Sequence, residues 1–334
     1  HRAIATTSIE SETPLDGGRK IVGFHKTPPM PTYLLFFGVG DFEYVEDRSF
    51  HVPIGVYATP GKAGLGAEAV VFTRQALAYC EKFTGVDYPV DKLDLIAVPE
   101  FAYGAMENLG AISFRENLLL FYPELVSTTG IEGIASITAH ECAHMWFGDL
   151  TSPLDWQYVW LNEAFATYVT GLILDDAHPE WRAADRFIRG AAGAAMTRDS
   201  LVNTIPIEFP DAGVTEIDSS TAPIVYSKAG LVLMMVHRWL GDEKFTAGVR
   251  NYLSRYAYQS VDTTGFLEAF GEGAGSLASE IIENWIHRPG FPLVRSRRTG
   301  PVLEIAQERF THLAHEDGQI WQIPISLCLF VESG

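Results

Sequence analysis

Cysteines, basic side chains and long apolar runs are all scarce in this chain of 334 residues. Its three cysteines, Cys80, Cys142 and Cys328, are too few and too widely spaced for a disulfide framework or a cysteine metal site. Because so few and so scattered cysteines favour a reducing compartment, we expect a cytoplasmic protein. The chain starts at His1, within a segment typical of β-structure, so we expect the native N-terminus to lie upstream.

The shortage of basic residues limits the kinds of binding partner that we expect. Acidic side chains number 42 against 24 basic ones, which gives a net charge of -18. Such a charge opposes binding to phosphate backbones and anionic lipid surfaces, so we expect no nucleic-acid partner. The short basic stretch Arg295–Arg298 is predicted to be a solvated loop. The sequence gives no indication of oligomeric state.

No apolar run approaches the roughly twenty residues that a membrane-spanning helix needs, so we expect no membrane span. Hydrophobic residues nevertheless make up 47% of the chain, enough for a large core. These proportions favour a globular protein longer than one typical domain.

Proline and glycine divide the first part of the chain. Residues 1–46 hold several prolines and the apolar run 33–40, which predicts loops and strands. A helix is predicted from about 64 to 84, where Gly85 ends it. Strands are predicted over 92–98 and 111–121, with a glycine-bearing turn between them at 104–108.

Helical spacing dominates the middle of the chain, and strand patterns return near its end. Helices are predicted over 131–147 and 155–175, a polar loop over 199–222, further helices over 224–288, and strands over 302–310 and 323–331. We therefore predict a mixed α/β (α+β) catalytic core between two partial β domains. The predicted domain boundaries are 1–46, 47–289 and 290–334.

The most informative pattern is His140-Glu141-Cys142-Ala143-His144. Two histidines four apart on a helix lie about 40° apart around its axis and about 6 Å apart along it, so both imidazoles can face one ion. Glu141 lies about 100° further around the helix, where it can reach a metal-bound water more easily than the metal. Glu141 is therefore predicted to be a base.

Glu163 follows His144 after eighteen intervening residues, 145–162, within a stretch whose apolar spacing predicts a second helix. An antiparallel neighbouring helix could bring its carboxylate to the two imidazoles. Three nitrogen or oxygen ligands that leave a fourth position for water are typical of catalytic zinc. The alternative is an ordinary core helix with a chance motif, and the third ligand argues against it.

For several other candidate residues, the sequence pattern alone does not decide between a structural and a functional role. Glu107, in the turn 104–108, is either an ordinary turn carboxylate or a substrate contact. Tyr226 has the pattern of a buried aromatic at the start of a helix. Lys228 is predicted to lie on a helix surface or at a cap, and Met234 and Met235 are predicted to lie in the core.

Several ordered motifs resemble those of a known family, the zinc aminopeptidases of the aminopeptidase N and leukotriene hydrolase type. These enzymes are gluzincins with a thermolysin-like catalytic domain. The matching segments are Gly-Ala-Met-Glu-Asn at 104–108, His-Glu-x-x-His at 140–144, Trp-Phe-Gly at 146–148, Trp-Leu-Asn-Glu at 160–163, and Tyr226 before Lys228-Ala229-Gly230. Flanking segments at 28–34 and 289–292 resemble the end of the family's N-terminal saddle domain and the start of its β-sandwich domain.

The resemblance implies one Zn²⁺ and a hydrolytic mechanism. The zinc would be held by His140, His144 and Glu163, with Glu141 as general base and Tyr226 as a hydrogen-bond donor to the oxyanion. The implied substrate-binding residues are Gly104, Ala105, Met106, Glu107 and Asn108. Glu107 would pair with a free α-ammonium, so the implied substrates are peptides with a free N-terminus.

The chain also departs from the family pattern. Cys142 replaces a common leucine, Ala164 a glycine and Asp149 a frequent asparagine, although none of these changes removes a catalytic atom. We expect Cys142 to be a buried, inert thiol.

The family's second amine-binding glutamate or glutamine and its C-terminal helical domain do not fit within these 334 residues, so we expect a fragment or a shortened member. Two alternatives follow: a lipid epoxide hydrolase of the same family, and a catalytically silent scaffold that binds protein partners.

Overall fold

The structure is a computed structural model that describes residues 1–124, 127–209, 217–313, 315 and 317–327. The chain divides into two compact units. Unit 1 comprises His1–Pro153, Phe165–Ala184 and Tyr256–Val261, and unit 2 comprises Leu154–Ala164, Asp185–Arg255 and Asp262–Gly334. The predicted mixture of helices and strands is confirmed, while the predicted domain boundaries after residues 46 and 289 stay a prediction.

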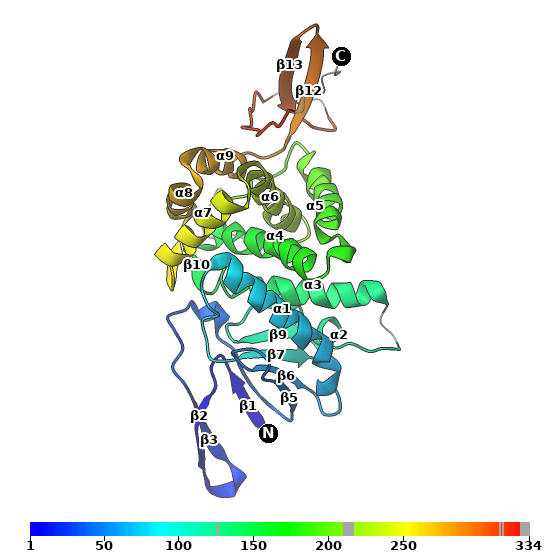
Figure 1. The fold of residues 1–334 in the computed structure, drawn as a ribbon. Coiled ribbons are helices and arrows are strands. Elements are labelled where there is room, and N and C mark those ends of the chain that lie inside the picture. Colours follow the sequence, from blue (N-terminus) through cyan, green and yellow to red (C-terminus); the bar gives the residue numbers. More distant parts are fainter. Residues whose placement is uncertain (125–126, 210–216, 314, 316, 328–334) are drawn as a thin grey trace, which may run out of the picture. The chain divides into compact units, whose positions relative to one another are not determined.

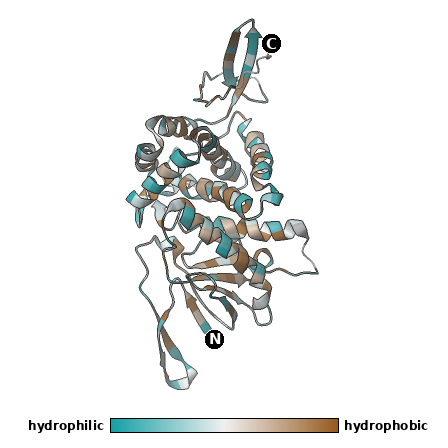
Figure 2. Cartoon of the chain, viewed as in Figure 1, coloured by the Kyte–Doolittle hydropathy of each residue, from teal (hydrophilic) through white to brown (hydrophobic). Residues whose placement is uncertain are grey.

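Unit 1 contains a five-stranded mixed sheet (Figure 1). Its strands, in spatial order, are β5 (Glu43–Asp47), β6 (Ile54–Ala58), β7 (Leu93–Val98), β9 (Ala111–Arg115) and β8 (Ala105–Met106). The three inner strands are parallel, and both edge strands are antiparallel to their neighbours. Inner parallel strands are buried on both faces, which explains their apolar runs, seen as brown strands in Figure 2.

Two long helices of unit 1 follow the predicted pattern. Helix α1 (Ala67–Thr84) packs against β6 and against α3 (Thr128–His144). Gly85 adopts a left-handed conformation with φ of 72° and caps α1, so the predicted end of this helix is confirmed.

The predicted strand 111–121 is only partly right. The strand β9 ends at Arg115, and a short helix, α2 (Glu116–Leu119), follows it. Leu119 and Leu120 are fully buried. A short, continuous apolar run has no periodicity that separates a buried strand from a buried helical turn, which accounts for the error.

The N-terminal part of unit 1 consists of strands and loops, as predicted for residues 1–46. Antiparallel pairs join β1 (Arg2–Ala5) to β4 (Phe37–Gly40) and β2 (Ile9–Pro14) to β3 (Lys20–Phe24).

A short parallel pair joins β10 (Thr151–Pro153) to β11 (Gln259–Val261). Short 3₁₀ turns in the two units are η1 (Asp16–Gly18), η2 (Thr32–Leu34), η3 (Ala63–Gly66), η4 (Trp156–Tyr158) and η5 (Pro179–Trp181).

Helix α4 (Trp160–Ala177) begins in unit 2 and continues as one helix into unit 1. The other long helices are α5 (Ala183–Asp199), α6 (Ala229–Leu240), α7 (Asp242–Arg255), α8 (Thr263–Ala274) and α9 (Ser276–Ile286). The predicted helices over 224–288 are confirmed, and residues 200–209 and 217–221 form turns and loops as predicted. Within the part of the chain that the structure describes, no helix has the length and apolarity needed to cross a membrane.

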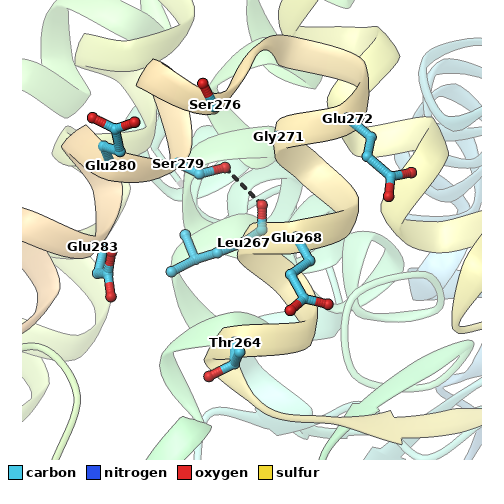
Figure 3. Close-up of a pocket in the computed structure, with 9 residues that line it drawn as sticks. All are labelled: Thr264, Leu267, Glu268, Gly271, Glu272, Ser276, Ser279, Glu280 and Glu283. Atoms are coloured by element: carbon cyan, nitrogen blue, oxygen red, sulfur yellow. Dashed lines mark hydrogen bonds between the residues drawn. The ribbon is translucent and has the colours of Figure 1, made fainter.

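Glycines allow close packing of α7, α8 and α9. A Cβ atom added at Gly273 of α8 would lie 2.5 Å from the carbonyl oxygen of Ala247 on α7. On the other side of α8, the Ser279 hydroxyl of α9 donates to the carbonyl oxygen of Leu267 at 2.7 Å (Figure 3). The contact at Gly273 is with backbone, which cannot move aside as a flexible side chain can.

We therefore expect Gly273→Ala to destabilise the protein by about 1–3 kcal/mol, because the methyl group must push α7 and α8 apart. The measurement is the shift in urea midpoint on unfolding. Gly190→Ala on α5 is the matched control, since a Cβ atom there meets nothing within 4 Å. This control should stabilise by about 0.4–1 kcal/mol. Equal midpoints for the two variants would contradict the packing argument.

The last described strands correct two predictions. The stretch Arg295–Arg298 is not a loop, since it lies in β12 (Pro292–Thr299), which pairs with β13 (Val302–Arg309). Its arginines are exposed, and Arg295 forms an ion pair with Glu308 at 2.6 Å. The first strand of this exposed hairpin has no alternation of apolar and polar residues, so the composition of residues 295–298 resembles that of a loop.

The predicted strand 323–331 is wrong for residues 323–327, which form no strand, and residues 328–331 lie outside the described part. Just before them, the Trp321 and Gln322 amides donate to side chains, at Gln307 and Asn284, instead of to a β-ladder.

Candidate active site

Helix α3 brings the two predicted imidazoles together. The Ser127 side chain accepts from the Gly130 amide and caps the start of the helix, and His144 is its last residue. The Nε2 atoms of His140 and His144 lie 3.1 Å apart, and the ring planes are inclined at 86°. The two ring nitrogens therefore converge on one small volume, as expected from their spacing of four.

The turn after α3 fixes the orientation of His144. Its Nδ1 lies 2.9 Å from the carbonyl oxygen of Phe147. Because a carbonyl can only accept, Nδ1 must carry the hydrogen, so in the neutral ring Nε2 is the nitrogen whose lone pair can bind a cation. The turn itself is held by the Phe147 amide, which donates to the Ala143 carbonyl, and by the Asp149 amide, which donates to the His144 carbonyl.

The third predicted ligand is placed by α4. Glu163 precedes Phe165 by two residues in this helix, and the Phe165 ring stacks on Phe147 with centroids 4.6 Å apart. Ligand atoms of His140, His144 and Glu163 all lie within 4.8 Å of one another. The three predicted ligands are therefore brought together, and two imidazoles with one carboxylate match the usual donor set of a catalytic zinc site.

Two further carboxylates lie beside the imidazoles. Ligand atoms of Glu107, Glu141 and His144 also lie within 4.8 Å of one another, and all three residues are buried. Buried carboxylates at such separations repel one another unless cations compensate them. A divalent metal and a substrate ammonium would both supply that positive charge, so the residues present fit a metal ion.

The predicted substrate-binding segment forms an edge strand followed by a turn. Gly104 precedes β8, in which Ala105 and Met106 pair with Phe114 and Ser113 of β9. A Cβ atom at Gly104 would lie 3.3 Å from the side chain of Ile137 on α3, so a small residue suits this position.

Residues 108–111, at the C-terminal end of this turn, are held in place by hydrogen bonds. The Asn108 side-chain oxygen accepts from the Ser113 hydroxyl at 2.9 Å, and the Asn108 carbonyl accepts from the Ala111 amide at 2.9 Å. Gly110 has φ of 70°, and its carbonyl accepts from the buried Lys92 ammonium at 2.7 Å. Glu107 is thus carried by a rigid backbone segment.

Asp149 is a residue whose place could not be predicted from sequence. Both of its carboxylate oxygens are buried and have no hydrogen-bond partner among the described residues. Burial raises the pKa of Asp149 well above its ordinary value, and the charge of Glu107 raises the pKa further. Asp149 is therefore a buried carboxyl group close enough to feel the charges of Glu107, His144 and Glu141.

Cys142 and Cys80 are both fully buried. Burial raises the pKa of the Cys142 thiol, which suppresses the reactive thiolate. The predicted burial of Cys142 is confirmed, its inertness stays a prediction, and Cys328 lies outside the described residues.

Tyr226 lies in unit 2, in a π-helical turn, η6 (Pro223–Lys228), that leads into α6. Single π-turns within helices are often found at functional sites. Its role at the oxyanion stays a prediction. Met234 is buried, as predicted, whereas Met235 is only partly buried. For Lys228, the predicted cap position is confirmed, since it is the N-cap residue of α6. The alternative of a helix surface is wrong, because this lysine is only 5% exposed and pairs with the buried carboxylate of Asp199.

Two imidazoles on one helix, a carboxylate from a second helix and a buried glutamate beside them match the donor set of a metallopeptidase zinc site. The profile described as "Peptidase family M1 domain" matches residues 68–285. The chain therefore belongs to peptidase family M1, whose members in general depend on zinc.

Curated relatives agree with this assignment. The chain is 38% identical over 312 residues to "Probable aminopeptidase 2" of Sulfurisphaera tokodaii, which covers 93% of this chain and 40% of the relative. It is 35% identical over 312 residues to "Leucyl aminopeptidase" of Saccharolobus solfataricus, with the same coverage of 93% and 40%. It is 34% identical over 318 residues to "Aminopeptidase M1" of Arabidopsis thaliana, which covers 95% of this chain and 36% of the relative. The chain thus spans about 40% of the length of the first two relatives.

Proposed function

We propose that this chain carries the catalytic centre of a zinc-dependent aminopeptidase that hydrolyses the N-terminal peptide bond of peptides with a free α-amine. The observation that carries the proposal is the grouping of Glu107 with Glu141 and His144 within 4.8 Å. The Glu107 carboxylate, which would bind the substrate amine, then lies close enough to Glu141 and His144 for a single N-terminal residue to span the distance. We further propose that residues 47–289 form a thermolysin-like catalytic domain between partial β domains, 1–46 and 290–334.

In this mechanism, His140, His144 and Glu163 would hold one zinc ion. When bound, the ion supplies Lewis acidity that polarises the scissile carbonyl and acidifies water. Glu141 accepts a proton from the attacking water, whose oxygen bonds to the carbonyl carbon. Glu141 then passes the proton to the departing nitrogen as the carbon–nitrogen bond breaks.

Two other side chains complete the proposed reaction. The Tyr226 hydroxyl donates a hydrogen bond to the oxygen on which negative charge develops, which favours the transition state over the bound substrate. Glu107 pairs with the α-ammonium and so places the first peptide bond, and no later one, at the reacting centre.

Glu107→Gln tests the amine contact. Losing the charge of a buried pair should lower kcat/KM for an alanyl fluorogenic amide by about 100-fold, mainly through KM. Glu100→Gln is the matched control, since Glu100 is exposed in the loop before the substrate-binding segment. An N-acetylated substrate should be poor for every variant. Unchanged discrimination between free and acetylated substrates in Glu107→Gln would reject the proposed role.

The two alternatives are less well supported. A catalytically silent scaffold does not need a complete donor set beside a buried base, yet this chain retains both. The relatives described above carry aminopeptidase names, which favours peptide over epoxide substrates. Assaying an aminoacyl amide against a lipid epoxide separates these activities.

A further inference from the structure

Unit 2 contains a buried ion pair that the proposed chemistry does not use. The Lys228 ammonium lies 2.8 Å from Oδ2 of Asp199, and the two side chains are 5% and 2% exposed. Lys228 is the last residue of the π-turn η6, and Asp199 is the last residue of α5. Ion pairs buried this deeply cost much desolvation free energy, so their remaining hydrogen bonds decide whether they are stable.

Every hydrogen of the Lys228 ammonium has an acceptor. Besides Asp199, it donates to the carbonyl oxygens of Arg288 at 2.9 Å and Gly290 at 2.8 Å. Three acceptors around one nitrogen require the charged form, which carries three hydrogens. Burial lowers the pKa of Lys228, and the Asp199 charge opposes that shift.

The Asp199 carboxylate is equally well satisfied. Its Oδ1 accepts from the Gly290 amide at 2.8 Å and from the Thr204 hydroxyl at 2.9 Å. One network therefore joins η6, the end of α5 and the turn 288–290. Because both charged side chains are buried, removal of either one would leave the other as an uncompensated charge in the interior.

The π-turn needs such an anchor. The Ala229 amide donates to the Ile224 carbonyl five residues earlier, which is the wide π spacing. This geometry is rare and occurs mostly as single turns within α-helices, often at functional sites. Tyr226 lies in the same turn, two residues before Lys228, and Ile224 and Val225 beside it are fully buried. Whatever holds Lys228 therefore also holds the backbone of Tyr226.

We propose that Lys228 is a positioning residue, whose pair with Asp199 fixes the π-turn so that Tyr226 is held in the geometry its oxyanion contact requires. This inference rests on the proposed function of Tyr226. Displacements of about 1 Å can cost an enzyme about 100-fold in rate, so an anchor two residues away has a measurable effect. Lys228 acts only through Tyr226, and this distinguishes it from a residue that merely stabilises the fold.

A double-mutant cycle on the full 334-residue chain tests the proposal. Tyr226→Phe should lower kcat by about 100-fold. Lys228→Met should lower kcat by about 10-fold, with KM and bound zinc unchanged. Because both losses arise at one contact, adding Lys228→Met to Tyr226→Phe should cost less than about 2-fold more. Lys244→Met, at an exposed lysine on α7, is the matched control and should leave kcat unchanged.

A full further 10-fold loss in the double variant would overturn the proposal, because a purely structural role reduces both backgrounds equally. A Lys228→Met enzyme with wild-type kcat would overturn it too. If Lys228→Met does not fold, Asp199→Asn replaces it in the same cycle, since it removes the charge that pairs with Lys228 without substituting any residue of η6. The same non-additivity supports the proposal, and additive losses reject it.

Hydrogen exchange separates failure of this inference from failure of the proposed function. Amides of residues 224–229 should exchange at least about 10-fold faster in Lys228→Met than in Lys244→Met, because the π-turn opens more often. Unchanged protection would reject the anchor itself. Faster exchange together with wild-type kcat in Tyr226→Phe would instead reject the catalytic role of Tyr226, and with it the effect of Lys228 on turnover.

Discussion

Glu141→Gln is expected to lower kcat by at least about 1,000-fold while zinc stays bound, since a positioned proton acceptor contributes up to about 10,000-fold. Glutamine matches glutamate in size but cannot take a proton from water. Glu141 is buried beside His144 and Glu107, so no bulk water replaces its function directly. Steady-state kinetics with an aminoacyl fluorogenic amide, with zinc measured by mass spectrometry, give both quantities on one sample.

Glu68→Gln, at an exposed glutamate in the first turn of α1, is the matched control and should leave both turnover and zinc within about 2-fold of the wild type, because surface substitutions have small effects. The assignment of Glu141 as base would be abandoned if Glu141→Gln kept turnover near the wild-type rate. Loss of zinc from this variant would also count against it, because a base that is not a ligand should not affect metal content.

Glu163→Ala is expected to remove both metal and activity. Residues that merely support a ligand contribute about 10- to 100-fold in metal affinity, so losing a ligand should cost at least about 100-fold. Turnover should fall to background at stoichiometric zinc and recover only in part in excess zinc. Metal titration followed by activity at each zinc concentration measures both effects.

Asp176→Ala provides the control for Glu163→Ala, because Asp176 is an exposed carboxylate on the same helix. It should bind zinc as the wild type does. Wild-type zinc affinity in Glu163→Ala would exclude Glu163 from the donor set, and the remaining histidines would then need another third ligand.

The local arrangement of the metal site could be predicted from sequence because it depends on helical geometry. The spacing of His140 and His144 fixes their relative direction, and the structure places their Nε2 atoms 3.1 Å apart. The apolar pattern around Glu163 predicted a second helix, and α4 confirms it. In both cases the evidence lies within a few turns of one helix.

Contacts between distant segments could not be predicted in the same way. Glu107 precedes Glu141 by more than thirty residues, and only the family resemblance gave it a role before the structure grouped the two. The Phe147 carbonyl that orients His144 is a backbone atom, so no side-chain pattern marks it. Lys228 was predicted to lie on a helix surface or at a cap, and its burial was missed because lysines are rarely buried and its partner Asp199 lies far away in sequence.

Turnover by the 334-residue chain itself tests the central claim most directly. The measurement is cleavage of a panel of aminoacyl fluorogenic amides and their N-acetylated counterparts, with chelator and after zinc is restored. We predict that free-amine substrates are cleaved, that acetylated ones are not, and that chelator abolishes cleavage until zinc is added. Cleavage that persists in chelator, or equal cleavage of acetylated substrates, would contradict a zinc aminopeptidase centre built on His140, His144, Glu163 and Glu107.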